Sequence, residues 1–205
     1  FCRLQGYRSL RAKACVAETN REGRADWFGR MVPGKLLLGD PAARDAAVHA
    51  IQACIPHARL LPVGAERIVP GFLDAGRAYS ISAREVLRRG DDFVYDVLIL
   101  AEDGSAVERW EGLELRKVEG IRAPSPWPEA LLAPYLQRRL EELVPCSSAS
   151  VALRRGNEGD RALRTKLALD ACLGEPARVE HRADGKPEVV TGPAPTGPRI
   201  GAARS

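Results

Sequence analysis

One alanine-rich segment constrains the fold of this chain more than any other. In residues 40–54 (DPAARDAAVHAIQAC), an aspartate that can cap a helix precedes a proline at the first helical position, and alanines follow. The predicted helix ends before Pro56. Its surface is apolar on most sides, and such a helix is usually buried. We therefore expect this helix to lie at the centre of a domain.

Strand-like segments flank the helix along the chain. Short apolar runs or strand-like patterning occur at residues 36–38, 60–68, 79–87, 93–101 and 106–118. Residues Glu102, Asp103 and Gly104 form a turn signal that joins the last two segments as a hairpin. One buried helix wrapped by a run of antiparallel strands is the economical packing, which places the chain in the α+β class.

A proline-rich stretch at residues 123–128 is the best candidate for a domain boundary. We expect a first domain at residues 1–122 and a partial α/β domain at residues 129–205. The second part contains four predicted segments: a helix at 129–143, a short strand at 150–153, a helix at 160–173 closed by Gly174, and a poorly ordered tail at 192–205.

The composition is that of an ordinary globular chain, with 45% hydrophobic and 28% charged residues. A net charge of +4 without a basic arm argues against a nucleic-acid partner. The lack of a long apolar run argues against a membrane partner, and we expect a cytoplasmic location. The five cysteines are scattered and form no C-x-x-C pair, so we predict no metal site. The sole methionine is Met31, which leads us to expect a piece of a larger polypeptide.

Three polar residues share one face of the predicted helix. Asp45, His49 and Gln52 are spaced i, i+4 and i+7. One interpretation is that they form the solvent-facing side of an amphipathic helix. The other interpretation is functional, because burying a carboxylate on an otherwise apolar helix costs free energy unless the group is paired. Cys54, at the end of the helix, is predicted to be a small core residue.

Four stretches of the first domain resemble one family of enzymes. They are WFG at residues 27–29, LGDPAARDAAVHAIQACIP at 38–56, LLPVGAERI at 60–68 and RWEGLELR at 109–116. They closely resemble the second half of the dehydratase domain of iterative enediyne polyketide synthases, and the resemblance covers residues 1–122. It implies a double hot-dog fold, in which each half wraps an antiparallel sheet around one helix.

The resemblance also implies a mechanism and partners. A histidine of the first hot dog removes the α-proton of a β-hydroxyacyl thioester, and the aspartate of the second hot dog protonates the departing hydroxyl. Asp45 and His49 occupy the two defined positions of the family's D-x-x-x-Q/H pattern, so Asp45 is the implied general acid and His49 its orienting neighbour. No cofactor is implied for the dehydratase. The implied partners are an acyl carrier protein with the substrate on phosphopantetheine, the N-terminal hot dog of the same dehydratase, and a second copy in a homodimeric synthase.

The sequence departs from the family at the expected base. The histidine motif of the first hot dog reads H-x-x-x-G-x-x-x-x-P, and this chain contains only His49, His57 and His181. His181 precedes Gly185 at the right distance, but Val190 replaces the proline. We therefore expect Asp45 to be half of a site and the chain alone to be inactive.

The second part of the chain resembles a different enzyme. HRADGKPEV at residues 181–189 looks like the R-x-D-G-K-P segment of a phosphopantetheinyl transferase, the domain that ends these synthases. This implies that Gly185, Lys186 and Pro187 line a coenzyme A phosphate site, although the same residues are typical of a surface turn. Coenzyme A and Mg²⁺ are implied only for a complete transferase domain, because the family's S-x-x-H-S motif is altered at residues 201–205.

Two alternatives to the dehydratase hypothesis stay open at this point. One is a stand-alone hot-dog thioesterase or hydratase that dimerises to complete its site. The other is a non-catalytic hot dog that only binds or shapes an acyl chain. A histidine motif upstream in the gene would exclude the first, and a measurement of water loss in the intact protein separates the second.

Overall fold

The computed structural model describes residues 3–22, 37–121, 128–144, 150–153 and 161–191. These ranges belong to two compact units, Phe1–Ala149 and Ser150–Ser205. Most of the predicted proline-rich boundary lies outside the described residues. The division between the units follows residue 149, so the helix after the boundary belongs to the first unit, whereas the sequence analysis assigns it to the second domain.

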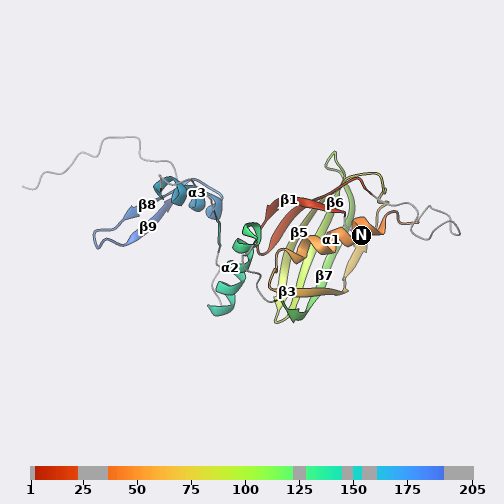
Figure 1. Cartoon of the computed structure of the whole chain (residues 1–205), viewed down its shortest axis with the longest axis horizontal. Helices are drawn as coiled ribbons and strands as arrows, with labels where there is room; N and C mark the ends of the chain where they lie inside the picture. The colour runs from red at the N-terminus through yellow and green to blue at the C-terminus, as the bar shows by residue number, and fades with distance from the viewer. Residues whose placement is uncertain (1–2, 23–36, 122–127, 145–149, 154–160, 192–205) are drawn as a thin grey trace, which may run out of the picture. The chain divides into compact units, whose positions relative to one another are not determined.

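The described part of the first unit contains seven strands and two helices (Figure 1). In chain order they are β1 (Leu4–Leu10), β2 (Ala14–Thr19), α1 (Pro41–Gln52), β3 (Ala58–Gly64), β4 (Arg67–Val69), β5 (Ser80–Arg89), β6 (Asp92–Leu100), β7 (Ala106–Gly120) and α2 (Glu129–Leu143). The strands form one antiparallel sheet in the order β1-β2-β5-β6-β7-β3, and β4 also pairs with β7. α1 lies across this curved sheet, which confirms the predicted hot-dog fold.

Helix α1 begins with the predicted cap. The Oδ1 atom of Asp40 accepts a hydrogen bond from the backbone N–H of Ala42 at 3.0 Å, and Pro41 takes the first helical position. The residues of its inner face are at most 3% exposed: Ala42, Ala43, Ala46, Ala47, Ala50 and Ile51. These small side chains let the helix backbone approach the sheet closely.

Large side chains from the central strands fill the rest of the core. The main contributors are Ile81, Phe93, Tyr95, Val97, Ile99, Trp110 and Leu115. Burying a side chain of this size stabilises the fold by about 1.5–3 kcal/mol before the entropy cost. Cys54 is fully buried among them, as predicted.

The strand predictions succeed in the middle of the sheet and fail at its ends. Strands β5, β6 and β7 match the predicted segments to within three residues. The segment 60–68 is two strands, and the break lies opposite Gly112 of β7, which has a φ of +64°. Residues 37–38, part of the short apolar run before α1, form a turn. β1 and β2 are not predicted at all, because charged residues interrupt their apolar pattern.

The second unit is small within its described residues. It consists of α3 (Arg161–Leu173) and a hairpin of β8 (Ala177–His181) and β9 (Pro187–Thr191). Gly174, at a φ of +76°, closes α3 by donating its N–H to the carbonyl oxygen of Asp170, as predicted. The predicted strand at 150–153 is wrong: β8 pairs only with β9, and the carbonyl oxygen of Ser150 instead accepts from the Cys172 thiol. The predicted tail at 192–205 lies outside the described residues.

Across the described ranges, no helix has the length and apolar character that a membrane crossing requires.

Candidate active site

Asp45 and His49 lie one turn apart on the side of α1 that faces away from the sheet. The Nδ1 atom of His49 is 3.5 Å from the Oδ2 atom of Asp45. The His49 side chain is 63% exposed and that of Asp45 is 36% exposed, whereas Ala46 and Ala47 between them are buried. The pair therefore occupies the open face of a helix whose opposite face belongs to the core.

One oxygen of the Asp45 carboxylate has different surroundings from those of an ordinary surface aspartate. Oδ2 is buried and accepts no hydrogen bond from any residue that the structure describes. The separation of 3.5 Å from His49 is too long for a strong hydrogen bond. A buried acceptor without a donor costs free energy, so it marks a place where a further group is expected to bind.

Gln52, the third residue of the predicted polar face, does not join this pair. Its amide nitrogen donates to the carbonyl oxygens of Ile55 at 3.1 Å and Ala58 at 2.5 Å. Its Oε1 atom accepts from the backbone N–H of Leu60 at 3.1 Å. Gln52 therefore ties the end of α1 to β3 and has a structural role.

A buried ion pair holds the first residue of the helix cap. The Nη1 atom of Arg3 donates to the Oδ2 atom of Asp40 at 2.5 Å, while the other oxygen of Asp40 caps α1. The side chains of Arg3 and Asp40 are 2% and 0% exposed. Arg3 also donates to the carbonyl oxygens of Asn20 and Arg77. The start of α1 is thereby fixed to segments that flank β1, β2 and β5.

A second ion pair holds the residue next to Asp45. Arg44 donates to both carboxylate oxygens of Glu108 at 2.7–3.2 Å. Glu108 also accepts from the indole N–H of Trp110 at 2.6 Å and the backbone N–H of Gly71 at 3.2 Å. Burial alone would raise the pKa of Glu108, but these hydrogen bonds outweigh it and hold the pKa below its usual range. Glu108 is therefore an ionised anchor for α1.

Neither ion pair can be predicted from the sequence pattern. Their partners are 37 and 64 residues apart in the chain, and spacing arguments address only residues a few positions apart. One local signal was available: Arg44 is a charged residue in the first turns of a helix that otherwise presents alanines to the core.

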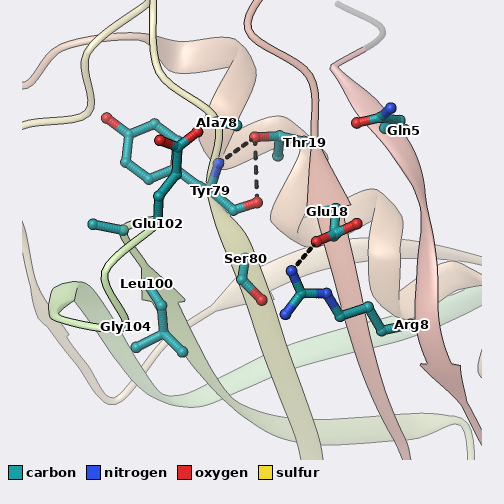
Figure 2. Close-up of a pocket in the computed structure, with 11 residues that line it drawn as sticks. Gln5, Arg8, Glu18, Thr19, Ala78, Tyr79, Ser80, Leu100, Glu102 and Gly104 are labelled. Carbon is teal, nitrogen blue, oxygen red and sulfur yellow. Dashed lines mark hydrogen bonds and ion pairs between the residues drawn. The ribbon is translucent and has the colours of Figure 1, made fainter.

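A pocket of about 280 Å³ lies at one end of the sheet and is not lined by Asp45 or His49 (Figure 2). Its walls come from β1, β2, β5 and the turn after β6. Arg8 pairs with Glu18 across it, and the Oγ1 atom of Thr19 accepts from the backbone N–H of Tyr79 at 2.8 Å. Because these groups already engage one another, the pocket is assigned no catalytic role.

The residues suggested for a coenzyme A phosphate form the turn between β8 and β9. Gly185 has a φ of +79° and donates its N–H to the carbonyl oxygen of Arg182. The N–H of Lys186 donates to the Asp184 carboxylate at 3.1 Å, and Pro187 begins β9. Both amides are thus engaged within the turn, and neither N–H is free to bind an anion in this arrangement.

Elsewhere in the described ranges, no three His, Cys, Asp or Glu side chains converge as a metal site would require.

Comparison with known proteins identifies the family. The family profile described as the polyketide synthase dehydratase N-terminal domain matches residues 2–124. The match covers more than half of the chain, so this chain belongs to the polyketide synthase dehydratase family. No curated protein matches the sequence.

Several solved structures are similar to part of the chain. One is an enoyl-isomerase of a trans-acyltransferase polyketide synthase, at 18% identity and a TM-score of 0.44, covering 55% of this chain and 44% of that one. Another is the dehydratase domain of RzxB from Pseudomonas fluorescens, at 19% identity and a TM-score of 0.44. The match covers 56% of this chain and 40% of that one. A third is a hypothetical thioesterase with coenzyme A from Streptococcus pneumoniae, at 13% identity and a TM-score of 0.42. The match covers 60% of this chain and 94% of that one. The chain spans less than half the length of the first two.

Proposed function

We propose that this chain is the second hot dog of a polyketide synthase dehydratase and that Asp45 is its general acid. The observation that carries the proposal is the placement of Asp45 on the open face of α1, with one buried carboxylate oxygen that no described donor engages. Membership of the dehydratase family supports the reaction class.

The proposed reaction eliminates water from a β-hydroxyacyl thioester. A base removes the α-proton, the electrons of that C–H bond form the new double bond, and the C–O bond at the β-carbon breaks. Asp45 gives its proton to the departing oxygen, which leaves as water rather than hydroxide. A positioned acid of this kind contributes about 10²–10⁴ in rate, which corresponds to about 3–5 kcal/mol of barrier. His49, at 3.5 Å, can orient the carboxyl group.

The assignment to the second half of the dehydratase rests on the presence of one motif and the absence of another. The description of the matched family names the N-terminal domain. The chain, however, carries the D-x-x-x-H pattern at Asp45 and His49, and its sequence contains no H-x-x-x-G-x-x-x-x-P motif. In this proposal the α-proton is taken by a histidine of the other hot dog, and the open face of α1 is the surface that the other hot dog completes.

The remaining parts of the proposal follow from the sequence resemblance. The substrate is a polyene precursor of enediyne biosynthesis, carried on the phosphopantetheine of an acyl carrier protein, and the synthase is a homodimer. The second unit is the start of a phosphopantetheinyl transferase-like domain. Because its turn amides are engaged, no contact with coenzyme A is assigned to Gly185, Lys186 or Pro187.

The test is the substitution Asp45→Asn in the complete synthase. The amide keeps the shape of the carboxyl group but has no acidic proton, so we expect dehydration to slow by about 10²–10⁴. β-Hydroxy intermediates on the carrier protein should accumulate and be visible by mass spectrometry. Asp91→Asn is the matched control, because the side chain of Asp91 is 68% exposed at the turn before β6. Unchanged polyene output from Asp45→Asn would remove Asp45 from the mechanism.

A further inference from the structure

Helix α2 attaches to the hot dog through one buried arginine. Arg138 is 0% exposed, and its guanidinium pairs with the carboxylate of Glu85 on β5. It also lies over the ring of Phe93, 5.3 Å from the ring centre. The same guanidinium donates to three further oxygens: the carbonyls of Ala12 and Cys54 and the hydroxyl of Tyr95. One side chain of α2 thus satisfies groups from four other segments of the unit.

The rim of this contact is complementary in charge. Glu141 of α2 pairs with Lys13 at 2.9 Å. Glu142 of α2 pairs with Arg88 at 3.3 Å and lies 3.3 Å from the ring nitrogen of His57. Acidic residues of α2 therefore meet basic residues of the hot dog around the buried arginine, which fixes the register of the helix.

The contact with Cys54 reaches the end of the helix that carries Asp45. The Nε atom of Arg138 donates to the carbonyl oxygen of Cys54 at 3.4 Å, and Cys54 lies two residues beyond Gln52, the last residue of α1. The carbonyl oxygens of Ile51 and Gln52 accept from the backbone N–H groups of Cys54 and Ile55. Arg138 therefore holds the turn that directly follows the helix.

The inner face of α1 makes such end contacts important. The side chains that normally interdigitate to fix a helix on its neighbour are here mostly alanine methyl groups, which project little. The position of α1 along the sheet then depends on the groups at its ends. These are Arg3 and Glu108 at the N-terminal end, through Asp40 and Arg44, and Gln52 and Arg138 at the other end, through β3 and the carbonyl oxygen of Cys54.

From this geometry we infer that Arg138 is a positioning residue: α2 locks the C-terminal end of α1 and thereby sets the placement of Asp45 and His49. The effect on catalysis rests on the proposed function, whereas the restraint of α1 does not. The helix after the proline-rich stretch is then a working part of the hot dog rather than the opening of the next domain.

The restraint is tested by hydrogen exchange in the full chain. In Arg138→Met, we expect amides of residues 46–55 to exchange at least about tenfold faster while those of β6 and β7 change by less than about twofold. Arg139→Met is the matched control, because Arg139 neighbours Arg138 on α2 but is 48% exposed. It should leave both regions unchanged. Equal acceleration in helix and sheet, or no acceleration in α1, would overturn the inference.

A second variant covers the case in which Arg138→Met does not fold, since it leaves the Glu85 carboxylate buried without its partner. Arg138→Lys keeps the charge but replaces the planar guanidinium fork by a single ammonium group. The ammonium cannot hydrogen-bond to all of the widely spaced acceptors at once. The same local loosening of residues 46–55 is expected. Unchanged exchange in this variant would contradict the role of the fork.

The effect on catalysis is read in the complete synthase. Arg138→Lys should lower kcat for dehydration by about tenfold or more and leave KM within about twofold, because misplacement of the acid affects the transition state more than binding. Loosened α1 with unchanged kcat would overturn the positioning role. If Asp45→Asn had no effect on dehydration, the proposed function would fail, and the exchange experiment would still decide whether Arg138 restrains α1.

Discussion

The substitution Glu108→Gln is expected to loosen the N-terminal end of α1 and to destabilise the first unit. Glu108 has a fully buried side chain that receives hydrogen bonds from Arg44, Trp110 and Gly71. The glutamine keeps one acceptor oxygen but presents an NH₂ group to these donors and removes the charge that pairs with Arg44.

The structure sets the size of the effect. Removing one partner of a buried ion pair costs about 3–5 kcal/mol. Arg44 keeps 22% of its side chain in solvent and retains the carbonyls of Leu38 and Gly71 as acceptors, so the loss should be smaller. We expect about 2–3 kcal/mol, which lowers Tm by roughly 5–10 °C in a unit of this size.

The assay is urea unfolding of the full chain followed by far-ultraviolet circular dichroism. Glu114→Gln is the control on the same strand, because Glu114 is 39% exposed and pairs with Arg116 at the surface; it should change stability by less than about 0.5 kcal/mol. A loss below about 0.5 kcal/mol for Glu108→Gln would refute the claim that this pair anchors α1.

The same pair predicts a pH dependence. Because the pKa of Glu108 is lower in the folded chain than in the unfolded one, its ionisation stabilises the fold above about pH 4.3. This contribution is lost as the pH falls through the folded value. The stability difference between the wild type and Glu108→Gln should therefore be full at pH 7 and shrink below about pH 4. A difference that stays constant down to pH 3 would mean that packing, not charge, carries it.

Three further predictions concern the helix, a close backbone contact and the second unit. His49→Ala in the complete synthase should slow dehydration by less than Asp45→Asn, because His49 orients the acid; equal losses would mean that His49 transfers a proton itself. Gly71→Ala should destabilise the chain by at least about 1 kcal/mol in urea unfolding, because a Cβ there would overlap the carbonyl oxygen of Val107, whereas Gly76→Ala has room and should be nearly neutral. The chain should transfer no phosphopantetheine to a carrier protein in a mass-spectrometric assay, and transfer would contradict the altered S-x-x-H-S motif.

The parts of the fold that the sequence predicts are those with local signals. The capped start of α1 depends on Asp40 and Pro41, and the hairpin of β6 and β7 depends on a turn whose Gly104 has a φ of +84°. β1 and β2 escape prediction because Arg8 and Glu18 form an ion pair on their solvent side, which hides the apolar alternation. The strand at 150–153 is predicted wrongly because patterning does not show whether a strand has a partner.

The candidate site is predicted only in part for the same reason. Helical spacing brings Asp45 and His49 together, as the sequence analysis expects. The spacing also suggests Gln52, whose side chain turns instead to β3. The groups that hold the helix in place, such as Arg138, come from distant segments of the chain, and neither periodicity nor motif spacing addresses them.

The proposed half-site is tested most directly by a dehydration assay on this chain with and without the upstream half of the dehydratase. A β-hydroxyacyl thioester is supplied, and formation of the conjugated product is followed by ultraviolet absorbance. We expect no turnover by the 205-residue chain alone, turnover when it is co-expressed with the upstream hot dog, and loss of that turnover in Asp45→Asn. Robust turnover by the isolated chain would contradict the half-site and favour a stand-alone hot dog that completes its site by dimerisation.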